Sequence, residues 1–177
     1  MARFVFIVSL CSALWGPSLS AMQVGQFNVE PQMLHQHVLL ETYLDTVGEP
    51  TRLFAYQFGK DIDSNFFYAL TIKGAVQGEN RGGYGLATMG LGYRQALSEL
   101  GGWHALASIG SGGGGSIAAQ GGLVLQTSLG AYLALQPQLH LELNYGHLIY
   151  PYGSFQSNVF SLGIDIISRR YRVETHE

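Results

Sequence analysis

The stretch "QLHLELNYGH" (Gln138 to His147) alternates apolar and polar residues. Every second residue from Leu139 to Tyr145 is apolar, and the residues between them are a histidine, a glutamate and an asparagine. Successive side chains of a β-strand point to opposite faces, whereas a helix repeats every 3.6 residues. The alternation therefore predicts a strand with one apolar face and one polar face.

The same alternation recurs from about residue 34 onward. It is clear in "NFFYALTIKG" (65–74), "GLVLQTSLGAYLAL" (122–135) and "VFSLGIDI" (159–166). Eight strands are predicted, over residues 34–46, 51–62, 65–77, 84–97, 102–111, 120–135, 138–150 and 157–171. In the fifth of these, neither face is clearly the apolar one.

The composition narrows the class of fold. Charged residues form 12% of the chain, where about 25% is typical of soluble domains. Most predicted strands are long enough to cross a membrane at a tilt, and closing the sheet removes its edges. We therefore predict an all-β fold, an eight-stranded antiparallel transmembrane up-and-down β-barrel. A soluble lipocalin-like barrel is the alternative, but it would need a charged exterior. The net charge of −3 does not favour nucleic acid as a partner.

The N-terminus resembles a secretory signal. Arg3 precedes a 12-residue apolar stretch (4–15), and "GPSLSA" (16–21) ends in small residues. Twelve residues fall short of the roughly 20 needed to span a membrane as a helix. We predict a cleaved signal peptide over 1–21, a periplasmic lead-in over 22–33, the barrel over 34–173 and a tail over 174–177. Cys11, the chain's single cysteine, leaves with the signal, so no disulfide is expected.

A glycine-rich run, "SIGSGGGGSIAAQGG" (108–122), interrupts the strands. A phosphate-binding loop is excluded because no "GK[ST]" follows and no strand-to-helix pattern surrounds it. A linker would leave three strands on its C-terminal side, too few to bury themselves. If the chain starts in the periplasm, alternate connections face outward and include the longer ones. Gly112 to Gly115 then lie in the third outer loop.

The chain resembles the small outer-membrane barrels of Gram-negative bacteria, of the OmpA transmembrane domain and OmpX type. The resemblance rests on the signal sequence, the eight alternating strands, "GLGY" (90–93) and the closing "FSLGIDIISRRYRV" (160–173). It implies a location in the outer membrane, contact with its lipid and lipopolysaccharide, and insertion by the barrel assembly machinery. Members usually end on an aromatic residue, whereas this chain continues through "ETHE" (174–177), so 171–173 would have to serve that role internally.

The polar faces of the predicted strands point into the barrel. They carry His37 and Gln57, and a set for which we predict a lumen polar network: Glu41, Lys73, Arg94, Gln126, His140, Glu142 and Asp165. Eight strands enclose a space just wide enough for side chains. Because isolated buried ions are costly, the opposite charges are expected to pair and seal the lumen. The alternative is a polar channel or binding site.

The same inward faces carry residues that could form a catalytic or metal site. His140 with Ser128 and His37 with Glu41 are candidate acid–base pairs. Lipid A deacylases of this architecture resemble one another in a His-x-Ser-Asn run near the C-terminus, and no such run occurs here. His35 and His37 alone would make a weak metal site. We predict no catalytic, cofactor or metal site.

The remaining histidines and the aromatic residues suggest membrane interfaces. His35 and His147 are expected there, and Tyr145, Tyr150, Tyr152 and Phe155 are expected to form an aromatic girdle, with a patch for a surface partner as the alternative. The predicted function is a non-enzymatic structural or surface-interaction role. The alternatives are an enzyme that modifies lipid A or phospholipid, and a narrow conduit for small apolar molecules.

Overall fold

The structure is a computed structural model that describes residues 22–24, 27–45, 50–78 and 80–175. The predicted signal peptide, 1–21, lies outside the described residues, as do the last two residues of the predicted tail. The described residues contain no helix long and apolar enough to cross a membrane.

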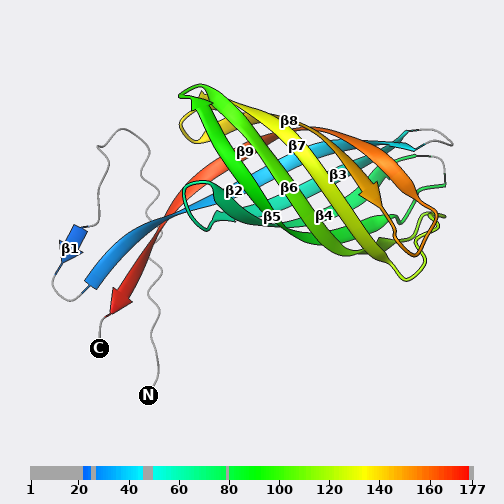
Figure 1. The fold of residues 1–177 in the computed structure, drawn as a ribbon, viewed down its shortest axis with the longest axis horizontal. Coiled ribbons are helices and arrows are strands. Elements are labelled where there is room, and N and C mark those ends of the chain that lie inside the picture. The colour runs from blue at the N-terminus through cyan, green and yellow to red at the C-terminus, as the bar shows by residue number, and fades with distance from the viewer. Residues whose placement is uncertain (1–21, 25–26, 46–49, 79, 176–177) are drawn as a thin grey trace, which may run out of the picture. The chain divides into compact units, whose positions relative to one another are not determined.

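Eight long strands form the barrel, and each pairs antiparallel with the next (Figure 1). An additional pairing of β2 with β9 closes the sheet. The strands are β2 (Phe27–Asp45), β3 (Thr51–Asp61), β4 (Phe66–Gln77), β5 (Gly85–Ser98), β6 (Gly101–Gly113), β7 (Leu123–Gln136), β8 (Leu139–Ile149) and β9 (Gln156–Thr175). The predicted fold class and number of barrel strands are confirmed.

The strand boundaries agree with the alternation except at the two ends of the chain. Each strand from β3 to β8 begins and ends within three residues of its predicted range. However, β2 begins at Phe27 and not near residue 34, and β9 continues to Thr175. The sequence suggested no strand before residue 34, because 22–33 show no period of two.

The chain divides into two compact units. One is the barrel of 34–168, which contains every predicted site residue. The described residues of the other are 22–24, 27–33 and 169–175. Within this second unit a short strand, β1 (Met22–Val24), pairs antiparallel with the start of β2, with Met22 opposite Val29.

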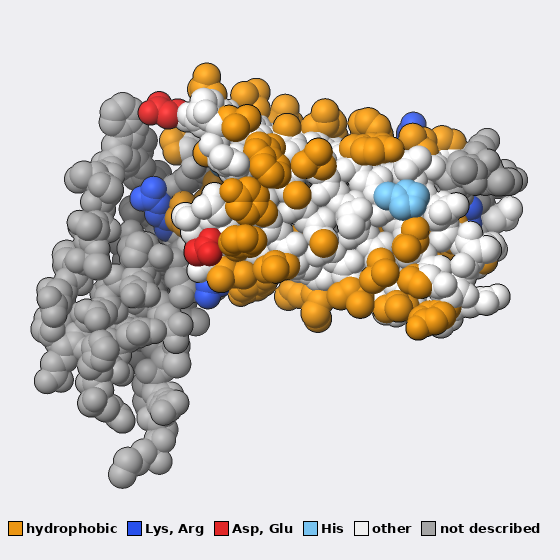
Figure 2. Space-filling model, viewed as in Figure 1, with side chains coloured by type: hydrophobic (Ala, Val, Ile, Leu, Met, Phe, Trp, Pro, Cys, Tyr) orange, Lys and Arg blue, Asp and Glu red, His pale blue; other side chains and the backbone are white. Residues whose placement is uncertain are grey.

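The wall of the barrel has an apolar outside. Leu141 is 38% exposed and its neighbour Glu142 only 2%, which is the facing that the alternation predicts. The same rule places these large apolar side chains outside: Phe66, Tyr68, Leu70, Ile72, Leu125, Leu129, Leu133, Leu143, Tyr145, Phe160, Leu162, Ile164 and Ile166. On the face visible in Figure 2, apolar side chains cover the barrel and the charged ones lie near its ends.

The two ends of the barrel differ in their connections. Residues 62–65, 99–100 and 137–138 make the short-turn end. The described residues 50, 78, 80–84, 114–122 and 150–155 lie at the loop end (Figure 1). Short turns at one end and longer loops at the other are typical of outer-membrane barrels. The expected alternation of connections is therefore observed.

The glycine-rich run divides between a strand and a loop. Gly112 and Gly113 end β6, although the sequence placed them in the outer loop. Gly114 and Gly115 follow with φ of +90° and +56°, a left-handed conformation that glycine adopts at little cost. Loop 114–122 is joined to loop 150–155 because the backbone N–H of Ser154 donates to the carbonyl oxygen of Ala118 at 3.2 Å.

Candidate functional site

An apolar plug fills the loop end of the barrel interior. It consists of Tyr43, Leu53, Tyr84, Leu86, Val124, Leu148, Tyr150, Phe155 and Val159. Ile117 and Ala119, from loop 114–122, pack against it. The Tyr150 hydroxyl donates to the Tyr84 hydroxyl at 3.2 Å, so two connections that are distant in sequence meet inside the mouth.

The plug corrects part of the predicted aromatic girdle. Tyr150 and Phe155 are buried in the plug, whereas Tyr145 and Tyr152 are exposed on the outside. Tyr150 continues the inward alternation of β8 through Glu142, Gly146 and Leu148, so its position follows from the parity of the strand. Tyr150 was predicted in the girdle with Tyr145 and Tyr152 only because the three residues lie close together in the chain.

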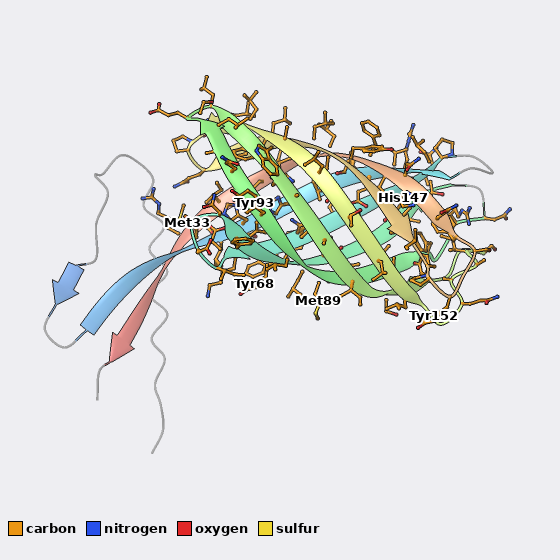
Figure 3. The ribbon with its side chains drawn as sticks, viewed as in Figure 1. Met33, Tyr68, Met89, Tyr93, His147 and Tyr152 are labelled. Atoms are coloured by element: carbon orange, nitrogen blue, oxygen red, sulfur yellow. The ribbon has the colours of Figure 1, made fainter. Side chains whose placement is uncertain are left out.

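Aromatic side chains gather near both ends of the outer surface. Phe66 and Trp103 flank Tyr93, with ring centroids 5.3 and 5.5 Å from the Tyr93 ring. Figure 3 shows Tyr93 toward the short-turn end, and His147 and Tyr152 toward the loop end. Aromatic belts of this kind mark the two membrane interfaces of a barrel. His147 is exposed, as expected of an interfacial residue, and its Nδ1 lies 3.0 Å from Oδ1 of Asn158.

A buried ion pair lies between the plug and the short-turn end. The Lys73 ammonium donates to both carboxylate oxygens of Glu41 at 2.9 Å and to Oε1 of Gln126 at 2.7 Å. An ammonium has three N–H donors, and here all three have acceptors. Full hydrogen bonding is the condition under which a buried ion pair is tolerated. Three of the predicted lumen residues therefore meet at one point.

A histidine–carboxylate cluster lies closer to the short-turn end. It comprises His35, His37, Glu142 and Asp165, all buried. Nδ1 of His37 lies 2.8 Å from Oε2 of Glu142, and Nδ1 of His35 lies 2.8 Å from Oδ2 of Asp165. The predicted interfacial position of His35 is wrong, because His35 and His37 share the inward face of β2.

Arg94 and His140 are half-buried beside this cluster. Nη1 of Arg94 lies 3.0 Å from Nε2 of His35, and the guanidinium carbon lies 5.0 Å from the centre of the Phe67 ring. It is also 5.9 Å from the Tyr132 ring, on which His140 stacks at 5.3 Å. Arg94 therefore sits between the imidazole and two aromatic faces.

The candidate acid–base pairs are not brought together. Ser128 lies opposite Gly146, six positions along β8 from His140, which corresponds to about 20 Å along the strand. Nδ1 of His37 contacts Glu142. Glu41 instead bonds to Lys73.

His104 is an interior residue that the sequence analysis missed. It is buried opposite Arg94 in the β5–β6 pair. A side chain on Gly130 would collide with His104 and Asn144, so this glycine makes room for both. Small residues on both faces of 102–111 obscured the alternation there. Antiparallel pairing with the preceding predicted strand would have placed His104 opposite Arg94, and so on the inward face.

Little open space remains inside the barrel. A cavity of about 30 Å³ lies among Glu41, Lys73, Glu142 and neighbouring side chains, which is room for one or two water molecules. The interior is thus filled by its own side chains, as is expected when eight strands close a barrel.

No family model matches the chain. No curated protein matches it either. Among solved structures it is similar to a de novo designed transmembrane β-barrel (14% identity, TM-score 0.59), with 78% of this chain and 98% of that chain covered. It is also similar to Ail, the attachment invasion locus protein of Yersinia pestis, with 10% identity and a TM-score of 0.51 over 78% of this chain and 97% of that chain. Neisserial surface protein A is similar as well, with 12% identity and a TM-score of 0.51 over 80% of this chain and 97% of that chain.

The fold is that of the small eight-stranded outer-membrane β-barrels, as the resemblance implied. The apolar outer surface and the outward aromatic cluster of Phe66, Tyr93 and Trp103 fit such a barrel in its membrane. At these identities the likeness concerns the fold. The role of the chain has to be argued from its own interior and loops.

Proposed function

We propose that this chain is a sealed outer-membrane barrel with a structural or surface-interaction role. The observation that carries the proposal is the filled interior, where the cavity among Glu41, Lys73, Glu142 and neighbouring side chains has a volume of about 30 Å³. The wall contacts outer-membrane lipid and lipopolysaccharide, and the barrel assembly machinery inserts it. The loop end is the surface left for a partner outside the cell.

The packing of the loops supports this assignment of the interaction surface. Loops 114–122 and 150–155 are joined by a backbone hydrogen bond, and the Arg81 guanidinium of loop 78–84 lies 5.4 Å from the centre of the Phe155 ring. Tyr152, 68% exposed, is the largest side chain on the outside of this group. Exposed aromatic residues on ordered loops are common in protein interfaces.

The two alternatives need features that run against this packing. A conduit for apolar molecules requires a continuous path, and here both the apolar plug and the Lys73–Glu41 pair block it. A lipid-modifying enzyme requires a nucleophile within reach of a base, and Ser128 and His140 lie about 20 Å apart along the strands. The first observation disfavours the conduit and the second disfavours the enzyme, so together they favour a structural or surface-interaction role.

The placement is tested by expressing the full chain in a Gram-negative host. We expect the protein in the outer-membrane fraction and at different gel mobilities before and after boiling, because a closed barrel resists detergent until heated. Leu141→Arg puts a charge on the lipid face and should destabilise insertion by about 2 to 4 kcal/mol, whereas Glu142→Gln should insert. Recovery of a heat-insensitive protein from the periplasm would refute the membrane placement.

The role is tested by lipid A mass spectrometry and by solute uptake into vesicles that contain the protein. We expect the same lipid A masses with and without the chain, and no uptake beyond that of empty vesicles. A change in lipid A that Ser128→Ala or His140→Ala abolishes would establish the enzyme alternative. Uptake of small apolar solutes would establish the conduit.

A further inference from the structure

Two buried hydrogen-bond acceptors face each other inside the barrel. Nε2 of His37 lies 3.8 Å from Oδ1 of Asp165, and neither atom has a hydrogen-bond partner among the described residues. The two residues are 1% and 0% exposed. Unsatisfied buried polar atoms are rare and call for an explanation.

The protonation of His37 follows from its other nitrogen. The Glu142 carboxylate is an acceptor, so Nδ1 of His37 must carry the hydrogen in their 2.8 Å contact. In the neutral ring, Nε2 then presents a lone pair toward the carboxylate oxygen of Asp165. Two lone pairs in that position repel each other unless a proton or a metal cation lies between them.

The surrounding side chains supply further metal ligands. His35, His37 and Asp165 each offer one ligand atom, and these atoms all lie within 4.8 Å of one another. Nδ1 of His140 is 3.8 Å from Oδ2 of Asp165. Imidazole nitrogens and a carboxylate are ligands for zinc, whose tetrahedral sites hold ligand atoms about 3.3 Å apart. The Glu142–His37 contact matches the carboxylate that commonly orients a metal-bound histidine.

The charges in this part of the interior also favour a cation. With neutral imidazoles, the described interior holds the carboxylates Glu41, Glu142 and Asp165, and half-buried Asp61 lies 3.4 Å from His35 at its edge. The cationic side chains there are Lys73 and Arg94. The carboxylates exceed them by two, and a divalent cation would balance that excess.

We propose that His35, His37 and Asp165 bind a divalent transition-metal ion of the zinc class. This inference goes beyond the proposed function and does not depend on it. Two imidazoles alone would make a weak metal site. Closure of the barrel between β2 and β9 adds the carboxylate that such a site lacked.

Arg94 competes with the ion through the tautomer of His35. With Nη1 of Arg94 donating to Nε2 at 3.0 Å, the hydrogen of His35 sits on Nδ1 and bonds to Asp165. When Arg94 moves away from Nε2, the hydrogen can move to Nε2 and bond to Asp61, 3.4 Å away. Nδ1 is then free to bind the ion, and the total number of protons is unchanged.

The proposal is tested with Zn²⁺ and Co²⁺ on the folded full chain in detergent, prepared without a histidine tag. Titration calorimetry should give one ion per chain, and Co²⁺ should show the absorption of a tetrahedral site. Zn²⁺ should also raise the unfolding midpoint, because it binds the folded state preferentially. His37→Gln should weaken binding at least tenfold. Arg94→Gln should strengthen binding, since it removes the competitor.

The matched control is His147→Gln, the same substitution at a histidine on the outer surface. It should bind Zn²⁺ as the wild type does. Heat-modified gel mobility establishes whether each variant is folded, and the wild-type stoichiometry decides the question even if His37→Gln fails to fold. The proposal is overturned if the wild type binds no ion, or if folded His37→Gln and His147→Gln bind equally.

Discussion

The loop end and the short-turn end of the barrel interior are lined by the same inward faces but are filled by opposite chemistry. At the loop end, tyrosine, leucine and valine side chains form the apolar plug. At the short-turn end, histidines and carboxylates pair with each other and with Arg94. The connections explain part of the difference. Loops 78–84 and 150–155 are long enough to place Tyr84 and Phe155 inside the mouth, whereas turns of two to four residues are not.

The two fillings should respond differently to substitution. Apolar packing has no preferred direction, so loss of one side chain removes contacts in proportion to its size. A buried ion pair depends on both partners, and removal of one leaves an uncompensated charge. A single substitution in the buried ion pair or the histidine–carboxylate cluster is therefore expected to cause a large loss of stability. A substitution in the plug should cause a loss that grows with the volume removed.

The largest effect is expected for Lys73→Met in the charged layer. This change leaves the Glu41 carboxylate buried without its cation, and should lower the free energy of unfolding by about 3 to 5 kcal/mol. The measurement is urea titration of the barrel in lipid vesicles.

The double variant Lys73→Met with Glu41→Met is the control for this prediction. It removes the pair as a unit and should recover most of the lost stability, because apolar replacement of a buried pair is often neutral. A double variant less stable than Lys73→Met would show that the pair is not the source of the effect.

Leu148→Ala should have the next largest effect, in the plug. Leu148 is fully buried, and truncation of such a leucine costs about 3 kcal/mol through lost packing and the cavity left behind. Leu143→Ala is the matched control on the same strand. Leu143 faces lipid, so its truncation loses apolar contact with the membrane but leaves no internal cavity, and it should cost less stability than Leu148→Ala. Equal losses in the same urea titration would contradict the division between plug and lipid face.

Tyr150→Phe should have a smaller effect at the top of the plug. It keeps the ring but removes the hydroxyl that donates to Tyr84 at 3.2 Å, which is worth about 1 kcal/mol. Tyr152→Phe, on the exposed outer surface, serves as the control and should be neutral. Thermal unfolding followed by gel mobility distinguishes the two variants. A larger loss of stability in Tyr152→Phe than in Tyr150→Phe would contradict the structural role given to Tyr150.

The smallest effect is expected at a turn of the short-turn end. Oδ1 of Asp63 accepts the backbone N–H groups of Phe66 and Asn65 at 2.7 and 2.8 Å, and these bonds lower the pKa of the carboxyl from its ordinary value of 3.8. A carboxyl whose pKa is lowered in the folded state stabilises the fold at pH values above its ordinary pKa. That contribution is lost as the pH falls through the folded-state pKa. The wild type should therefore exceed Asp63→Asn slightly in unfolding midpoint at neutral pH.

In strong acid the two proteins should unfold at the same midpoint. Because the Asp63 side chain is fully exposed, this difference should also be the smallest of the series. A difference between wild type and Asp63→Asn that grows as the pH falls would contradict the assigned sign.

Between residues 34 and 171, the alternation of the sequence by itself determined where the strands lie and, except in β6, which way their side chains face. Leu141 and Glu142 lie on the predicted faces because side-chain direction depends only on parity along one strand. Parity also assigned the inward position of Glu41, Lys73 and Asp165. Parity also places His35 inside, because His35 shares the face of His37 and Glu41. The prediction of an interfacial His35 rested on its polarity alone and was wrong.

Only the tertiary structure decided which inward side chains meet. Lys73 reaches Glu41 across the intervening strand β3, and Asp165 meets His35 across the closure of β2 on β9. Arg94 contacts His35. These partners depend on the register, tilt and stagger of the closed sheet, which set the height of each residue in the lumen. Alternation records the face of a residue but not its height, so the ion pair and the histidine–carboxylate cluster exist only once the barrel has closed.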